Sequence, residues 1–375
     1  MDYLIELQSE HLFNNIKIIK NISQCIIAPV VKSNAYGHGI KEIISLLKKD
    51  PTVEYICVAY TNEAIKAKEF GWINKIIIMS AASNDITIDI QYQYFVYSFD
   101  FLSNLLQKAI AYNILFEVHI KLNCGMNRFG FNKNEINKLI KLLTKNTKYI
   151  KIVGICTHLP RLNYVFTEEI NNQIKLFNQL VKKLQNVFGA NLMIHPFASK
   201  GINLIHKTNA NSNMVRVGGA LYGLLNNEQK RILLKEDNSN TLSQIMTLKT
   251  KVVMIQSIKK NEYIGYGENY KAKKNETIAI ASFGYGYGYS ISLLNAPISG
   301  YCNHEYLCFA GIIGMNALFF DITHIKNNIK IGDYIILTNN NIPQMNAALL
   351  SNQYIGGREY VFTTMLHESI TRIIL

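Results

Sequence analysis

Residues 26–39 read Ile-Ile-Ala-Pro-Val-Val-Lys-Ser-Asn-Ala-Tyr-Gly-His-Gly, an apolar run that stops at Lys32 and is followed by a turn-rich segment. A strand of this composition would bury its apolar side chains in a core. The lysine that ends it would lie at the mouth of that core, partly removed from water. Because burial disfavours the ammonium form, the pKa of such a lysine falls and its amine becomes a nucleophile. Taken alone, the segment also fits an ordinary strand-end lysine in solvent.

The rest of the first 230 residues repeats this alternation of short β-rich runs and amphipathic helices. Strand-like runs are predicted to end near Lys32, Ala59, Ser80, Ser98, Leu122, Thr157, Phe197 and Val217. Apolar residues recur three and four apart most clearly over 40–49, 100–112, 135–145 and 166–188. Eight strands with mostly intervening helices predict an α/β fold, a parallel (β/α)8 TIM-type barrel. The segment 85–92 is β-branched and fits either kind of element.

From about residue 240 the pattern changes to strands separated by tight turns. Strand-like runs occupy 249–257, 277–283, 306–313, 318–322 and 334–337, and a helical period returns only at 344–350. This pattern predicts a mostly β second domain, connected to the first by the polar stretch 226–240. We therefore expect a barrel over residues 1–235 and a β domain over 236–375.

Length and composition describe a globular protein of 375 residues, with 49% hydrophobic and 17% charged residues. The apolar stretches are too short to span a membrane, and no secretory signal is visible, so we expect a cytoplasmic protein. Six cysteines occur singly and without a Cys-x-x-Cys pair. They favour buried free thiols over disulfides or a zinc site, and no metal is expected.

The formal charge of +13 raises the question of nucleic-acid binding. The lysines, however, are scattered among asparagine and isoleucine, and no arginine-rich run or known binding motif is present. The glycine-rich run 284–288 follows a predicted strand but opens no helix, which disfavours a dinucleotide loop. We therefore expect neither a nucleic-acid nor a membrane partner.

Several residues suited to catalysis or phosphate binding fall at or just past the predicted C-terminal ends of barrel strands, where barrels gather their chemistry. They are Lys32, Arg128, His158, Ser199, Arg216, Gly218 and Gly219. Barrels also tend to bind phosphate after strands seven and eight, where the serine hydroxyl and the glycine backbone N–H groups lie. A lysine, phosphate donors and two arginines at one rim suit a pyridoxal-phosphate site. Each residue alone has an ordinary structural explanation, whereas their joint placement favours a site.

Eight segments resemble, in order and spacing, those of bacterial alanine racemases. Residues 30–39 resemble that family's lysine segment V-V-K-A-N-A-Y-G-H-G, and 121–130 resemble K-x-D-T-G-M-x-R-x-G. The others are 157–158 (T-H), 214–223 (V-R-P-G-I-A-L-Y-G), 266–267 (the Y-G of S-Y-G), 284–289 (G-Y-A-D-G-Y), 315–316 (M-D) and 364–373 (T-I-N-Y-E-I-L-T-R-I). The resemblance covers nearly the whole chain.

The resemblance implies interconversion of L- and D-alanine through pyridoxal phosphate by two bases, which would provide D-alanine for peptidoglycan. Lys32 would hold the cofactor and act as one base. Tyr266, supplied by the partner subunit of a homodimer, would act on the opposite face of the α-carbon. Arg216 would face the pyridine nitrogen without protonating it, and His158 would orient Arg216 and support the tyrosine.

The same resemblance implies roles for the remaining site residues. Tyr36, Ser199, Gly218, Gly219 and His367 would bind the cofactor phosphate, with His367 standing where the family has a tyrosine. Arg128, Met315 and Tyr285 would contact the substrate, and Lys121, carbamylated in many relatives, would position Arg128.

Some positions depart from the family pattern. Asn123, Asn213 and Asn316 stand in place of aspartates, Tyr287 in place of the aspartate of G-Y-A-D-G-Y, and Ile291 and Ile312 in place of arginines near the substrate entrance. These departures predict a weaker electrostatic attraction for the substrate carboxylate, with the reaction type unchanged.

Related proteins on the same barrel remain alternatives. Small pyridoxal-phosphate-binding proteins lack the C-terminal β domain and hence a counterpart of Tyr266. Related decarboxylases of basic amino acids carry an acidic residue in place of Arg216. Another amino-acid racemase, or a cofactor-binding protein of low activity, is the remaining alternative.

Overall fold

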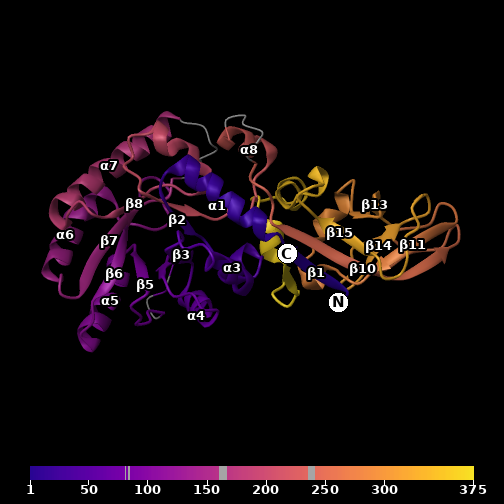
Figure 1. The fold of residues 1–375 in the computed structure, drawn as a ribbon, viewed down its shortest axis with the longest axis horizontal. Helices are drawn as coiled ribbons and strands as arrows, with labels where there is room; N and C mark the ends of the chain where they lie inside the picture. The colour runs from indigo at the N-terminus through magenta and orange to yellow at the C-terminus, as the bar shows by residue number, and fades with distance from the viewer. Residues whose placement is uncertain (81, 83–84, 160–166, 235–240) are drawn as a thin grey trace.

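The computed structural model has two parts, a barrel and a β domain, and both chain termini lie near their junction (Figure 1). It describes residues 1–375 except 81, 83–84, 160–166 and 235–240. The barrel is the indigo-to-magenta half of Figure 1, and the β domain is mostly orange to yellow. The predicted boundary between 235 and 236 falls outside the described residues and stays a prediction.

Eight parallel strands in the described part of the chain form the barrel. They are β2 (Ile26–Pro29), β3 (Tyr55–Val58), β4 (Lys75–Ile78), β5 (Tyr92–Val96), β6 (Phe116–Lys121), β7 (Ile150–Cys156), β8 (Met193–His195) and β9 (Met214–Val217). Strands β3 to β8 pair consecutively, and β2 pairs with β9. Bridges between Val30 and Cys57 and between Ala198 and Arg216 join the two groups into a ring. The predicted barrel is confirmed, and each strand ends at or within three residues of its expected end.

Helices connect most of these strands and cover the outside of the barrel (Figure 1). They are α3 (Ile40–Leu47), α4 (Thr61–Glu69), α5 (Phe99–Tyr112), α6 (Ile136–Lys145), α7 (Glu168–Phe188) and α8 (Asn227–Leu234), whereas the short α2 (Lys32–Tyr36) follows β2 at the mouth of the barrel. Helix α5 illustrates how the sequence sets them. Its cap Ser98 accepts the Phe101 N–H at 3.2 Å, and Leu102 and Leu105 are buried one turn apart.

The ambiguous segment 85–92 forms neither a helix nor a strand before Tyr92, where β5 begins. Instead, the Asp85 carboxylate accepts the Thr61 N–H at 3.2 Å, and the Asp85 carbonyl accepts the Thr61 hydroxyl at 2.5 Å. These contacts connect the segment to the beginning of α4, just past the C-terminal end of β3.

The second part is a mostly β domain, as predicted. Its strands are β1 (Tyr3–Leu7), β10 (Met246–Ile258), β11 (Glu276–Ala281), β12 (Gly300–Cys302), β13 (Glu305–Phe309), β14 (Leu318–Asp321), β15 (Tyr334–Thr338) and β16 (Arg372–Ile374). Their order in the sheet is β11-β14-β13-β12-β15-β10-β1-β16, and the long β10 also pairs with β11. The expected helix over 344–350 is a 3-10 turn followed by the short α9 (Ala347–Leu350), and α10 (Val361–Met365) precedes β16.

The first residues of the chain belong by hydrogen bonding to this second sheet, because β1 lies between β10 and β16. Helix α1 (Ser9–Ser23) then leads into the barrel. On α1, the buried Asn15 amide donates to the carbonyls of Leu221 (3.0 Å) and Ser243 (2.8 Å). Buried apolar side chains of both parts form one continuous cluster, so the two parts are packed together.

All six cysteines are free thiols, five of them buried and Cys308 exposed. Within the described ranges, no helix is both long and apolar enough to cross a membrane. Within the same ranges, no cluster of three or more metal-ligating side chains was found.

Candidate active site

A cavity of about 500 Å³ opens at the C-terminal ends of the barrel strands. Nine of the residues predicted from the sequence line it: Lys32, Tyr36, Lys121, Arg128, His158, Ser199, Arg216, Gly218 and Gly219. The four other predicted residues, Tyr266, Tyr285, Met315 and His367, do not line it.

Lys32 is the first residue of α2, three residues past the end of β2, and its side chain lines the cavity. Burial lowers the pKa of Lys32, and the nearby Arg128 guanidinium lowers it further, while the Glu63 carboxylate opposes both. The neutral amine is therefore available at a lower pH than in a free lysine. This is the environment of a nucleophilic lysine.

The four residues after Lys32, Ser33 to Tyr36, have φ between +52° and +56°, a left-handed turn without a glycine. This conformation costs L-residues about 1–2 kcal/mol each, so surrounding contacts must hold it. The Glu63 carboxylate provides one such contact by accepting the Ser33 N–H at 2.6 Å and the Ala59 N–H at 2.7 Å. Glu63 thereby connects the segments that follow β2 and β3, next to Lys32.

The C-terminal segment contacts the same turn from the other side. A Cβ on Gly37 would lie only 1.8 Å from the Thr363 carbonyl oxygen, and φ at Gly37 is +82°. The Arg372 guanidinium donates to the Gly37 carbonyl at 3.1 and 2.9 Å. The conformation of the lysine turn therefore depends on packing between the two parts of the molecule.

Another part of the cavity wall carries groups suited to binding a phosphate. The Ser199 Oγ accepts the N–H groups of Gly218 (3.1 Å) and Ala220 (3.3 Å), which leaves its own hydrogen free to donate. A Cβ on Gly218 would lie 2.3 Å from the Tyr36 hydroxyl, so glycine is required for this close approach. Backbone N–H groups and hydroxyls that converge after strands seven and eight are typical of barrel phosphate sites.

Arg216 lies on β9 and is only 4% exposed. One guanidinium nitrogen is 2.6 Å from His195 Nδ1 and also donates to the His195 carbonyl. The other donates to the Thr157 carbonyl at 2.8 Å. These hydrogen bonds, all donated by the Arg216 guanidinium, hold it in place on the cavity wall.

Burial lowers the pKa of two further basic residues of the cavity. Burial lowers the pKa of Lys121 to about 8, and its amine lies 5.7 Å from the centre of the Phe95 ring. Burial, reinforced by the neighbouring cations, lowers the pKa of His158 to about 2. The positive charge of the cavity comes instead from the guanidinium groups of Arg128 and Arg216, which stay charged and favour an anionic ligand.

The remaining predicted residues lie on the C-terminal domain and are exposed. Tyr266, Met315 and Tyr285 expose 77%, 55% and 42% of their surface. The Tyr285 N–H donates to Gly314 O, and the Gly286 N–H donates to Met315 O, each at 3.0 Å, so the two segments run together. His367 is exposed as well, and its Nδ1 lies 2.7 Å from the Ser369 hydroxyl.

Comparison with known proteins identifies the family of both parts of the chain. Residues 7–226 match the family model for the alanine racemase N-terminal domain, and residues 245–374 match the model for its C-terminal domain. The chain belongs to the alanine racemase family.

Individual alanine racemases align over nearly the full length. The one from Wigglesworthia glossinidia brevipalpis is 31% identical over 355 residues, 93% of each chain, and the one from Clostridium tetani is 29% identical over 377 residues, 98% of this chain and 94% of that one. The solved alanine racemase of Clostridium difficile 630 has a TM-score of 0.87 at 25% identity and covers 100% of this chain and 96% of its own. The Bartonella henselae alanine racemase, solved with covalently bound pyridoxal phosphate, has a TM-score of 0.81 at 22% identity, with 100% of both chains covered.

One expected contact of this alanine racemase family member is made by a different residue. We expected His158 to orient Arg216, but the side chain hydrogen-bonded to Arg216 is His195. The reason is position, because β8, which carries His195, borders β9, whereas His158 follows β7, one strand farther away. The sequence held a signal for this residue, since His195 directly precedes Pro196 at a predicted strand end.

The sequence also gave no indication that the C-terminal segment reaches the cavity. Arg358, Glu359 and Tyr360 line it, and the Tyr360 ring lies 5.2 Å from the Tyr36 ring, edge to face. The Glu359 carboxylate pairs with Lys200 at 2.7 Å, which fixes this segment beside Ser199. This alanine racemase fold thus encloses its cavity with residues of both parts.

Proposed function

We propose that the protein is an alanine racemase that uses pyridoxal phosphate to interconvert L- and D-alanine. The observation that carries the proposal is the convergence on one cavity of Lys32, Arg216 and the phosphate-binding groups around Ser199. Its relatives over 93% or more of the chain are named alanine racemases, which supports the same activity.

The residues present fit this cofactor. Lys32 offers an amine of lowered pKa to the aldehyde, and the Ser199 and Tyr36 hydroxyls with the Gly219 N–H suit the phosphate. The close approach of Tyr36 to the Cα of Gly218 makes a cradle that any side chain at 218 would fill. When bound, pyridoxal phosphate would acidify the α-proton of an amino acid attached to it.

Lys32 would move the proton on one face of the substrate. Since burial and Arg128 lower its pKa, its neutral amine can take the α-proton and return it at a lower pH than the amine of a free lysine could. Arg216 would hold the ring nitrogen without giving up a proton, because a guanidinium only donates and stays charged. Negative charge then remains at the α-carbon, which favours its reprotonation over transamination.

Two further cavity residues would act on the substrate carboxylate. The Arg128 guanidinium would bind it, and Lys121 would position Arg128. With a pKa of about 8, the Lys121 amine is neutral more often than that of a free lysine, and the neutral form is the one that adds carbon dioxide to become a carbamate. Such a carbamate would be an anionic partner for Arg128 within the same cavity.

The second base would come from a partner subunit. Tyr266 lies in the connection between β10 and β11, does not line the cavity of its own chain, and is 77% exposed. In a two-fold dimer, each C-terminal domain can complete the cavity of the other chain with Tyr266, Tyr285 and Met315. We propose such a homodimer in the cytoplasm, making D-alanine for peptidoglycan.

The proposal is tested with purified protein loaded with pyridoxal phosphate. We expect visible absorbance from the attached cofactor, its fixation by borohydride to Lys32, and conversion of L-alanine to D-alanine in a chirality assay. Loss of a general base and anchor should lower the rate about 10³-fold or more in Lys32→Ala. Lys41→Ala, an exposed lysine on α3, is the matched control. Full activity in Lys32→Ala would refute the assignment.

A further inference from the structure

A series of buried hydrogen bonds runs from Arg216 through the barrel interior. The Nε2 of His195 lies 2.9 Å from the Nδ1 of His119, and the Nε2 of His119 lies 2.9 Å from the Oε1 of Gln93. The Gln93 amide nitrogen then donates to Oε2 of Glu117 at 2.9 Å. Four strands contribute to this series, which we call the relay: β9, β8, β6 and β5.

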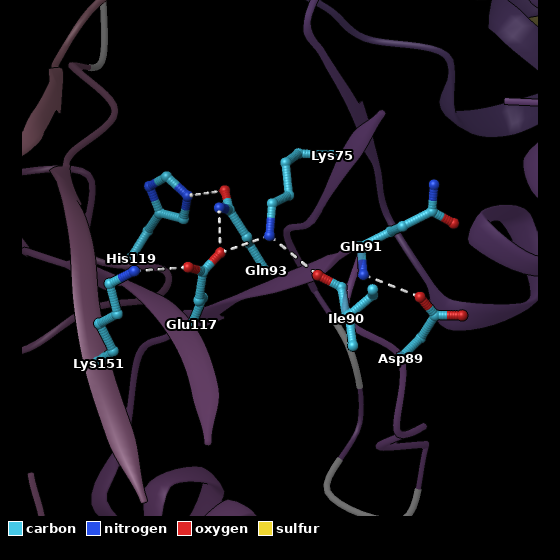
Figure 2. Close-up of polar contacts among 8 residues, drawn as sticks. All are labelled: Lys75, Asp89, Ile90, Gln91, Gln93, Glu117, His119 and Lys151. Carbon is cyan, nitrogen blue, oxygen red and sulfur yellow. Dashed lines mark hydrogen bonds and ion pairs between the residues drawn. The ribbon is translucent and has the colours of Figure 1, made fainter. Parts of the chain in front are cut away.

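The relay ends at the N-terminal ends of the strands, away from the cavity, and Figure 2 shows its last contacts, from His119 to Glu117. Glu117 and Gln93 are the second residues of their strands, so they lie at the N-terminal ends. There the Glu117 carboxylate pairs with Lys75 at 2.8 Å and with Lys151 at 2.9 Å (Figure 2). Lys75 is fixed in turn by a 2.9 Å bond to the Ile90 carbonyl.

Only one arrangement of hydrogens satisfies the relay. Arg216 can only donate, so His195 Nδ1 must be bare and its proton must lie on Nε2. That proton is donated to His119, whose Nδ1 is then bare and whose Nε2–H donates to Gln93. The amide of Gln93 must present oxygen to His119 and nitrogen to Glu117, since the flipped amide would oppose donor to donor and acceptor to acceptor. Every bond therefore points from the guanidinium toward the carboxylate.

Burial makes this direction matter. His119 and His195 are fully buried, and Gln93 is 2% exposed. Burial lowers the pKa of His119 to about 3 and that of His195 well below its usual value, so both rings are neutral. In the described part of the chain, Arg216 forms no salt bridge, although a buried charge is costly without compensation. The relay is its hydrogen-bonded connection to a carboxylate.

The backbone makes room for the relay. His119 on β6 reaches His195 on β8 across β7, where residue 154 is glycine. A Cβ on Gly154 would lie 2.1 Å from His119 Nδ1, the atom that accepts from His195. The pairing of β6 with β7 also shifts at this point, from Val118–Ile152 to His119–Gly154. A glycine and a bulge thus coincide at the crossing point.

We propose that Glu117, Gln93 and His119 are positioning residues for Arg216. By fixing the tautomer of His195, they hold the guanidinium in the one orientation that serves the cavity. The expected effect on transamination and racemisation rests on the proposed function, whereas the expected single tautomer of His195 does not.

The test uses the loaded holoprotein labelled with ¹⁵N-histidine, because ring ¹⁵N shifts distinguish bare from protonated nitrogens. Wild type should show His195 in a single tautomer with a bare Nδ1. Gln93→Met removes both polar contacts with little change of length, and Gly154→Ala obstructs the crossing while keeping every relay group. In both variants we expect mixed His195 tautomers. We also expect about a tenfold higher ratio of transamination to racemisation, the effect of one hydrogen bond to a charged group, with KM for alanine unchanged.

Matched variants separate positioning from mere stability. Lys151→Met removes one ion pair of the Glu117 carboxylate. Because the Lys151 side chain is 57% exposed, this variant should leave the His195 tautomer and the ratio of transamination to racemisation unchanged. The exchange Gln93→Glu with Glu117→Gln reverses the bond between 93 and 117 but keeps an acceptor oxygen facing His119 Nε2, so it should restore the single tautomer. A folded Gln93→Met variant with one His195 tautomer and an unchanged ratio would overturn the proposal.

Two further outcomes are also decisive. If Gln93→Met and Gly154→Ala fail to fold, Glu117→Gln keeps the shape and should still raise the ratio about threefold by weakening one bond; no change in tautomer or ratio there would equally overturn the relay. If the wild type forms no D-alanine, the proposed function fails, while the histidine shifts continue to test the relay.

Discussion

The barrel and the C-terminal domain carry the predicted site residues in opposite ways. On the barrel, nine of them line one cavity, placed there by the ends of parallel strands. On the C-terminal domain, Tyr266, Tyr285 and Met315 lie on exposed connections and line no part of that cavity. The barrel half of the site is assembled within one chain, whereas the other half is presented outward. A second copy of the chain is the partner that this difference predicts.

The largest expected effect comes from separating the two halves onto different chains. Lys32→Ala and Tyr266→Ala homodimers should each be inactive. In a mixed dimer with shared sites, one site carries both lesions and the other carries neither. Mixing the two variants should therefore restore activity in proportion to the heterodimer formed, up to one working site in two, as measured by D-alanine formation against heterodimer content by mass.

The control for this experiment is each variant mixed with itself under the same exchange conditions. If both bases came from one chain, every site in the mixture would carry one lesion and the mixture would stay inactive. Inactive heterodimers, confirmed by mass, would thus contradict the shared site and leave the barrel chemistry untouched.

The barrel could be predicted from the sequence because its signals are local. Alternating apolar runs and 3.6-residue periods located each strand end, and parallel strands bring their C-terminal ends to one rim. Pairing between distant segments has no such signal. Strand β1 pairs with β10, 239 to 247 residues away along the chain, and nothing in residues 3–7 distinguishes it from a first barrel strand.

The candidate site could be predicted to the same extent and for the same reason. Lys32, Ser199 and Arg216 lie at or just past the C-terminal ends of strands, so their meeting followed from the fold. The left-handed turn after Lys32 could not be predicted, because its four residues include no glycine and tertiary contacts hold them. The relay was missed too, since Gln93 and Glu117 lie at the opposite rim and matter only through bonds that cross strands.

A smaller effect tests the barrel half alone. Glu63→Gln removes the carboxylate that raises the pKa of Lys32, so the pKa of Lys32 should fall further. Because the neutral amine is the base, the acid limb of the kcat/KM profile should move to lower pH. Ser33 and Ala59 donate to different oxygens of Glu63, and glutamine offers only one oxygen, so one of the two bonds is lost, which should cost about 1–3 kcal/mol in urea unfolding.

Glu69→Gln is the matched control for this variant, with the same loss of charge at an exposed position on the same helix α4. It should move neither the profile nor the unfolding midpoint. An acid limb that shifts to higher pH in Glu63→Gln would contradict Lys32 as the base that titrates there.

The smallest expected effect concerns the C-terminal half. Ile312 and the exposed Asn316 flank Met315, and both replace charged residues of the family pattern. In the dimer they would lie near the entrance of the partner's cavity. Ile312→Arg combined with Asn316→Asp should lower KM for alanine about threefold at low salt. The added guanidinium attracts the substrate carboxylate, and such a charge at the rim acts mainly on the rate of association.

Salt and charge sign distinguish attraction from a change of shape. The gain should diminish as ionic strength rises, since the Debye length falls to about 8 Å near physiological salt. Asn316→Asp alone adds only a negative charge and should raise KM instead. Equal KM values in all three proteins, at both low and high salt, would show that this surface does not face the substrate path. The exposed half of the site would then need a different arrangement of the two chains.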